Sequence, residues 1–101
     1  MTEKPERRWH VRKDLDVPSV IRVGGTRRYK AVLLDLSEKG CALSIAGPIP
    51  SEDIWSLKIE GLDALRCSVQ WRLGQKVGVE FVEKLHPAVV DHFCQNHPRL
   101  I

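Results

Sequence analysis

The stretch LRCSVQWR, residues 65–72, has the clearest pattern in this 101-residue chain and decides the fold class. Apolar and polar residues alternate along it, and we expect the apolar set to face a core: Leu65, Cys67, Val69 and Trp71. We expect the polar set to face solvent: Arg66, Ser68, Gln70 and Arg72. Because successive side chains of a β-strand point to opposite faces, this period of two predicts a half-buried strand.

Similar segments recur along the chain, separated by turn residues: 19–23, 28–36, 40–47, 54–60 and 76–81. We expect three of them to turn these side chains inward: Cys41, Leu43 and Ile45; Trp55, Leu57 and Ile59; Val77, Val79 and Phe81. The glycines of GGT at 24–26 suit a hairpin connection. Six short strands at even spacing predict a closed or sandwiched antiparallel β-structure.

The chain changes character at residues 85–97, LHPAVVDHFCQNH. Leu85, Val89 and Phe93 follow one another at four-residue steps, which predicts the apolar face of a helix. Pro87 suits the first turn of such a helix. We therefore expect a short C-terminal helix laid over one opening of a barrel.

Length and composition indicate one globular domain, with 43% hydrophobic and 29% charged residues. We divide it into an N-terminal segment (1–16), a β-barrel (17–84) and a C-terminal helix and tail (85–101). The N-terminal sequence has no apolar signal region, and no apolar run is long enough to span a membrane. The chain has three widely spaced cysteines, which we expect to be buried and reduced in a cytoplasmic protein: Cys41, Cys67 and Cys94.

Positive charge is concentrated at the front of the chain. Residues 1–30 hold nine Lys/Arg against four Asp/Glu, a balance of +5, whereas the remaining residues hold seven against nine, a balance of −2. The segment ERRWHVR, residues 6–12, places three arginines where no hydrophobic period supports a core. Alone, it is typical of a solvated charged terminus. The uneven balance indicates an anionic partner, and the small patch favours a small anion over a long polyanion.

The arginines have the chemistry of a nucleotide grip. Arg7, Arg8 and Arg12 carry flat, permanently charged forks that can clamp phosphate oxygens or pair with the O6 and N7 acceptors of guanine. Trp9 offers a π-face for a purine or for a guanidinium group.

A second polar stretch, DLSEKG at residues 35–40, lies between two expected strands. Alone, it is typical of a turn. Asp35, when ionised, accepts hydrogen bonds only, which suits the N1–H and N2–H donors of guanine. Ser37 can give or take a further hydrogen bond, and Gly40 lets the backbone approach a flat ligand closely. Together, the two stretches describe a guanine nucleotide pocket.

RRWHVR followed by DLSEKG resembles the paired signature of PilZ domains, small β-barrel receptors for the bacterial second messenger cyclic di-GMP. The family pattern is RxxxR, usually preceded by another Arg, and then [D/N]xSxxG. The matching residues are Arg8 and Arg12 with Arg7 in front, then Asp35, Ser37 and Gly40. Residues 69–81, VQWRLGQKVGVEF, also resemble the family's tryptophan-bearing strand and the strand after it.

The resemblance implies a mainly β fold: a six-stranded antiparallel barrel of split-barrel type, a short C-terminal α-helix and a flexible N-terminal segment. It implies that Arg8 and Arg12 grip guanine and phosphate groups while Asp35 and Ser37 hold a guanine edge. Arg7 would support phosphate binding. It further implies a non-enzymatic receptor whose N-terminal segment wraps over bound cyclic di-GMP. We expect the signal to pass to a downstream protein partner.

Two other functions fit parts of the sequence. A small barrel that binds single-stranded nucleic acid would use the basic arm with Arg27 and Arg28 at a hairpin tip. It should lose orders of magnitude in affinity on moderate added salt, whereas a pocket with few phosphate contacts should lose far less. The other is a nucleotide-independent protein–protein adaptor.

Enzymatic and metal chemistry have little support in the sequence. It has no nucleophile elbow, P-loop or HExxH motif, and we expect neither catalysis nor a cofactor. The spacing of His92, Cys94 and His97 fits no zinc pattern, so we expect no metal site.

Overall fold

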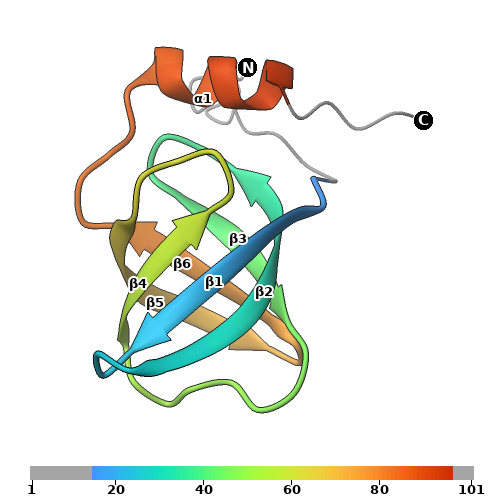
Figure 1. Cartoon of the computed structure of the whole chain (residues 1–101), viewed down its shortest axis with the longest axis vertical. Helices are drawn as coiled ribbons and strands as arrows, with labels where there is room; N and C mark the ends of the chain where they lie inside the picture. The colour runs from blue at the N-terminus through green and yellow to red at the C-terminus, as the bar shows by residue number, and fades with distance from the viewer. Residues whose placement is uncertain (1–14, 97–101) are drawn as a thin grey trace, which may run out of the picture.

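The computed structural model describes residues 15–96 and contains six strands and one helix (Figure 1). Their bounds are β1 (Val17–Val23), β2 (Arg27–Leu36), β3 (Gly40–Ile45), β4 (Ile54–Ile59), β5 (Leu65–Leu73), β6 (Lys76–Phe81) and α1 (Pro87–Asn96). Antiparallel neighbours close the strands into a barrel in the order β1-β2-β3-β6-β5-β4. The predicted six-stranded barrel with a short C-terminal helix is confirmed.

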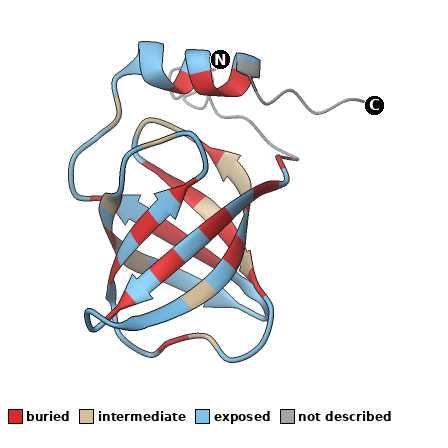
Figure 2. Cartoon of the chain, viewed as in Figure 1, coloured by how far each residue is buried: buried red, intermediate tan, exposed pale blue. Residues whose placement is uncertain are grey.

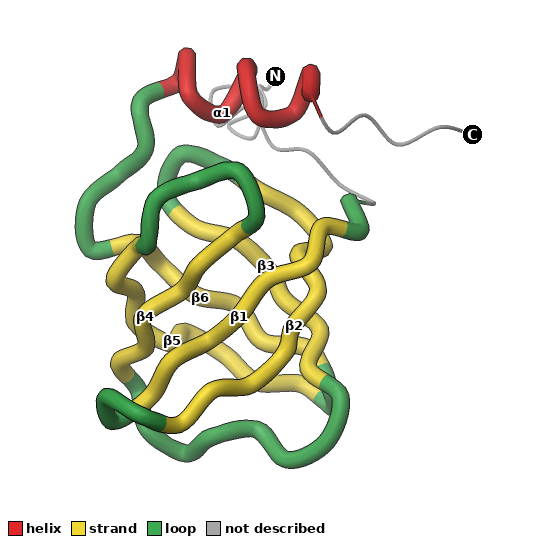
Figure 3. Tube along the Cα trace, viewed as in Figure 1, coloured by secondary structure: helices red, strands yellow, loops and turns green. Residues whose placement is uncertain are grey.

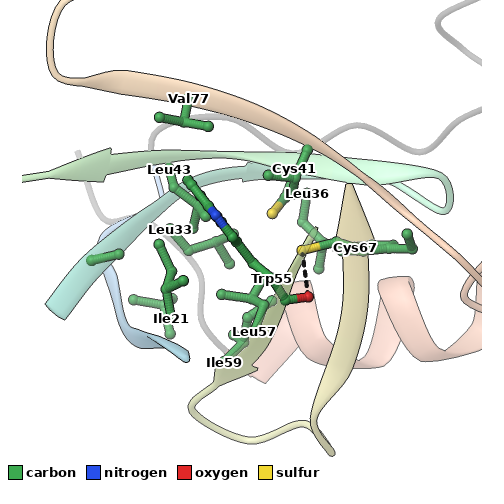
Figure 4. Close-up of a cluster of buried hydrophobic side chains, with 14 of the residues drawn as sticks. Ile21, Leu33, Leu36, Cys41, Leu43, Trp55, Leu57, Ile59, Cys67 and Val77 are labelled. Carbon is green, nitrogen blue, oxygen red and sulfur yellow. Dashed lines mark hydrogen bonds between the residues drawn. The ribbon is translucent and has the colours of Figure 1, made fainter. Parts of the chain in front are cut away.

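Alternating burial along the strands builds the core inside the barrel, as the banding of β1 in Figure 2 shows. The inward sets predicted for β3, β4 and β6 are all buried. Trp55 is the largest buried side chain at 1% exposed, and its indole N–H donates to the backbone oxygen of Glu52 at 2.9 Å. Figure 4 shows it among aliphatic side chains of neighbouring strands. This tryptophan therefore fills the barrel without leaving its one polar group unpaired.

The three cysteines are buried, as expected, and none of them forms a disulfide bond. The thiol of Cys67 donates to the backbone oxygen of Trp55 at 3.7 Å (Figure 4). Burial raises the pKa of Cys67 to about 11. Burial, and secondarily the neighbouring Cys67 and Asp35, raises the pKa of Cys41 well above its usual range. Both side chains therefore behave as small apolar groups at neutral pH.

Helix α1 lies across one end of the barrel (Figure 3) and buries Val90, Phe93 and Cys94. The expectation that Val89 faces the core is wrong, because 38% of its surface is exposed. Side chains three and four residues apart share a helix face, so Val90 joins Phe93 and Cys94 there. Within residues 15–96, no helix is long and apolar enough to cross a membrane.

Two β-bulges interrupt the regular alternation, one in β2 and one in β5. In β2 the register shifts between Leu33 and Asp35, so that Asp35 pairs with Ala42 while Leu36 keeps its place in the core. A bulge adds one residue to one strand and re-aims the side chains that follow. Asp35 is therefore part of a strand, and it faces outward from the barrel.

The second bulge places Trp71 on a different face of the sheet from the one predicted. The register of β5 shifts between Val69 and Trp71, so that Trp71 pairs with Gly78 instead of continuing the inward row of Cys67 and Val69. Its side chain is 47% exposed. The expectation that Trp71 belongs to the core is wrong, since the extra residue at Gln70 turns the indole to the outer surface.

Candidate functional site

A hollow of about 480 Å³ lies on the outer surface of the barrel, over β3 and β6 and the adjoining parts of β2 and β5. We call it the bulge hollow, because both bulges border it. It brings together the three residues expected from DLSEKG, namely Asp35, Ser37 and Gly40. Its other lining residues, which the sequence did not single out as site residues, include Lys39, Gln70, Trp71 and Glu80.

The floor of the bulge hollow is a row of four residues from four neighbouring strands. The register places Asp35 opposite Ala42, Ala42 opposite Gly78, and Gly78 opposite Trp71. The two middle residues carry a methyl group or no side chain, so no large side chain of this row stands between the carboxylate and the indole. Strands lie about 4.8 Å apart, so the two outer strands of the row are separated by roughly 14 Å.

The indole of Trp71 lies over Gly78. A Cβ atom built on Gly78 would overlap Nε1, Cε2 and Cζ2 of the Trp71 ring. The absent side chain of Gly78 therefore makes room for the ring against the sheet. A half-exposed indole held in this way offers one π-face to the hollow.

Asp35 is held in place by the backbone of the neighbouring strand. Its Oδ1 accepts a hydrogen bond from the N–H of Ala42 at 3.0 Å. The β2 bulge brings the side chain to the outer face, and this bond orients the carboxylate at the edge of the bulge hollow. A carboxylate fixed in this way is an acceptor for paired N–H donors on a ligand.

The hydroxyl of Ser37 is used within its own loop. Its Oγ donates to the backbone oxygen of Gly40 at 3.2 Å and accepts from the N–H groups of Lys39 and Gly40, each at 3.3 Å. A serine hydroxyl has one donor and two acceptor positions, so these three bonds take up its capacity. Ser37 therefore shapes the connection between β2 and β3.

Gly40 allows two strands to approach each other closely. It pairs with Glu80 of β6, and a Cβ atom at Gly40 would overlap the backbone oxygen of Val79. Its φ is not in the left-handed region, which the structure assigns to other glycines. The glycine is thus required where β3 meets β6, at the rim of the bulge hollow.

Charges at the bulge hollow are unevenly distributed among the described residues. Asp35 and Glu80 contribute carboxylates, whereas Lys39 contributes one ammonium group. The expected phosphate grips Arg7, Arg8 and Arg12, and the expected stacking residue Trp9, lie outside the described residues. The described half of the site is therefore suited to base recognition.

The chain enters the described structure next to this hollow. The N–H of Leu15 donates to the backbone oxygen of Leu34 at 3.0 Å, and Leu34 directly precedes Asp35. Leu15, the first described residue, therefore lies beside the part of β2 that carries the carboxylate of the site.

Comparison with models of known families matches residues 6–93 to the PilZ domain, which covers most of the chain. The chain belongs to the PilZ domain family. PilZ domains are ligand-binding, non-catalytic modules that generally bind cyclic di-GMP. A search of curated proteins gave no match.

Trp71 is the main site residue that the pattern-based reasoning misplaced. Strict alternation put its side chain inside the barrel, because a bulge adds no unusual residue type to the sequence. The available signal was Gly78 in the next strand, since a glycine within a strand often marks a close approach. Among residues 15–96, no group of three or more His, Cys, Asp or Glu side chains is placed to hold a metal ion.

Proposed function

We propose that this PilZ domain is a non-enzymatic, cytoplasmic bacterial receptor that binds cyclic di-GMP in the bulge hollow. The observation that carries the proposal is that Asp35 and Trp71 both turn outward and line one hollow. A guanine base needs an acceptor for its N–H donors and a π-face for its ring, and the two residues supply these.

Asp35 would select guanine over adenine. The carboxylate accepts hydrogen bonds only, which matches the neighbouring N1–H and N2–H donors of guanine. Adenine presents an acceptor at N1, so a carboxylate in the same place would repel it. The bond from the Ala42 N–H holds the carboxylate ready for this pairing.

Trp71 would stack on the ligand. Stacking of a base on an aromatic side chain contributes about 1–3 kcal/mol. The position of the ring over Gly78 supports this role, because an indole held against the sheet loses little further freedom when a base arrives.

Arg7, Arg8 and Arg12 would supply the positive charge for the phosphates. Arg12 precedes Leu15 by three residues, a stretch of chain that spans at most about 11 Å. Leu15 is hydrogen bonded to Leu34, next to Asp35. This attachment supports the proposal, because it keeps the arginines within reach of a ligand on the bulge hollow.

We further propose that the signal passes to a protein partner when residues 1–16 reorder around the ligand. Trypsin cleaves after arginine, so a ligand gripped by Arg8 and Arg12 should slow cleavage at these residues. Cleavage at equal rates with and without cyclic di-GMP would contradict this mechanism, provided that binding is shown separately.

Isothermal titration calorimetry tests the receptor assignment. The wild-type chain should bind cyclic di-GMP and should bind cyclic di-AMP and GTP much more weakly. Arg12→Ala should lose about 1–3 kcal/mol of binding free energy, the worth of a bidentate charged contact. Asp35→Ala should lose mainly the preference for guanine.

Arg22→Ala is the matched control for Arg12→Ala, because Arg22 lies on β1, away from the bulge hollow. It should bind like the wild type. Absence of cyclic di-GMP binding by the folded wild-type chain would refute the proposed function.

A further inference from the structure

A second hollow, of about 750 Å³, lies mainly over β1 and β2, with further lining residues from β4 and from Ser44 of β3. We call it the β1 groove, and its central residues are Pro18, Val20, Lys30, Val32 and Lys58. Strand β1 is three places from β6 in either direction around the six-stranded barrel. Figure 1 shows β1, β2 and β4 in front and the orange β6 behind. The two hollows therefore have different centres, and they approach each other on β3, where Ser44 lines the β1 groove and Ala42 lines the bulge hollow.

The floor of the β1 groove is apolar and exposed. Val20 and Val32 are 37% and 38% exposed, and Pro18 lies directly opposite Val32 in the strand register. Val20 has Lys30 opposite it on one side and Lys58 opposite it on the other. An apolar side chain seated on Val20 would therefore lie between two lysines.

The charge around this floor is strongly positive on one side. Arg22 lies directly opposite Arg28, next to the lysine row. Like charges directly opposite each other destabilise a strand pair. In the described part of the chain, neither these arginines nor Lys30 forms an ion pair.

Lys58 is also without a carboxylate partner among the described residues. Its ammonium group donates to the backbone oxygens of Leu62 and Ile59, which leaves its charge uncompensated. The acidic residues Asp16 and Glu60 line the other end of the groove. Lys30 and Lys58 thus line the groove on either side of Val20, Arg22 and Arg28 lie next to them outside its lining, and none of the four forms an ion pair within the described residues.

We propose that the β1 groove is the docking surface for a partner protein, in particular for an acidic segment that carries an apolar side chain. The apolar side chain would cover Val20, and carboxylates on either side would reach Lys30 and Lys58, with Arg22 and Arg28 beyond. Charge complementarity selects this occupant for the part of the groove around Val20, where an exposed apolar side chain lies between two lysines that form no ion pair within the described residues. The proposal does not depend on the nucleotide.

Other occupants fit the groove less well. Residues 1–14 carry five Lys/Arg against three Asp/Glu and would bring further positive charge to the lysines. In a dimer whose two-fold axis passes near Val20, the lysines of one copy would face those of the other. The residues that line the groove include no aromatic ring on which a nucleic-acid base could stack.

A random peptide library displayed on phage, panned against the full chain, tests the proposal. Enriched peptides should carry Asp or Glu on both sides of an aliphatic or aromatic residue. Labelled synthetic copies should bind the wild type in fluorescence anisotropy. They should bind the Lys30→Glu/Lys58→Glu variant roughly tenfold or more weakly, because like charges across an interface repel.

The matched control is Lys76→Glu/Lys84→Glu, which makes the same charge change at two exposed lysines outside the groove and should bind the peptides like the wild type. Thermal melting by circular dichroism checks that each variant folds. If the glutamate pair does not fold, Lys30→Gln/Lys58→Gln replaces it, with a smaller loss expected.

Two results would overturn the proposal. One is a library without acidic enrichment, or acidic peptides that bind the lysine variants as well as the wild type. The other is binding of homopolymeric RNA or phosphatidylglycerol vesicles through Lys30 and Lys58 while acidic peptides fail to bind, which would assign the groove to nucleic acid or to a membrane surface.

Discussion

Trp55 and Trp71 belong to neighbouring strands, yet we expect Trp55 to contribute to stability and Trp71 to contribute to ligand binding. Trp55 is 1% exposed inside the barrel, whereas Trp71 is 47% exposed on the bulge hollow. Trp55→Ala should cost about 3–5 kcal/mol, because it leaves a large cavity in the core. Trp71→Ala should change the free energy of unfolding by less than about 1 kcal/mol, as for a surface residue. Urea denaturation of both variants measures the difference.

The two tryptophan variants also distinguish an effect on stability from an effect on ligand binding. Trp71→Ala should weaken cyclic di-GMP binding while its unfolding transition stays near that of the wild type. If Trp71→Ala unfolds the domain as severely as Trp55→Ala, the outward position of Trp71 is refuted.

At the scale of elements, helix α1 depends on an unusual N-terminal cap. The Nδ1 atom of His86 accepts a hydrogen bond from the N–H of Ala88 at 3.0 Å. An acceptor side chain in this place satisfies one of the free N–H groups of the first helical turn. His86→Ala should therefore lower the free energy of unfolding by about 0.5–2 kcal/mol. His86→Asn, which restores an acceptor, should recover most of the loss; equal urea midpoints for the two variants would contradict the cap.

The strands also show how far the sequence predicts this fold. Alternation correctly predicted the buried rows of β3, β4 and β6, because in these strands a period of two follows directly from the pleat. It failed at Trp71 because the register shift depends on pairing with β6, which lies outside the sequence of β5 itself. The helical spacing of four residues misplaced Val89, because such steps do not distinguish between adjacent faces of a helix.

The sequence likewise predicts only part of the candidate site, because some of its contacts form only between strands that are separate in the sequence. The residue types of DLSEKG pointed to Asp35, Ser37 and Gly40, and the structure places all three at one hollow. The bond network that occupies the Ser37 hydroxyl, and the approach of Val79 to Gly40, arise only when β3 and β6 come together.

At the scale of the whole molecule, buried thiols should make the barrel sensitive to alkali. The pKa of Cys67 is raised to about 11 in the folded state, and that of Cys41 is raised as well. Between their ordinary values near 9 and these raised values, the unfolded chain releases protons that the folded chain retains, so stability falls as pH rises. The free energy of unfolding should therefore decline above pH of about 9.

Urea titrations across this pH range measure the effect, and Cys67→Ala serves as the control. The control should be less stable overall, but its stability should depend less steeply on pH. A wild-type profile that stays flat above pH of about 9 would show that the thiols are not protected by burial.

The barrel separates two surfaces with different chemistry. The bulge hollow over β3 and β6 offers a carboxylate, a small-residue floor and an indole, whereas the β1 groove offers an apolar floor bordered by cations. We therefore propose separate surfaces for ligand binding and partner docking, which approach each other on β2 and β3. We expect the nucleotide to bind in the bulge hollow and not in the β1 groove.

An NMR titration of the isotopically labelled chain with cyclic di-GMP tests this expectation most directly. We expect the largest shifts at the Trp71 indole N–H and the backbone amides of Ala42 and Gly78, while the amides of Val20 and Lys58 stay nearly unchanged. Shifts concentrated at Val20 and Lys58, or a spectrum that saturating ligand leaves unchanged, would contradict it.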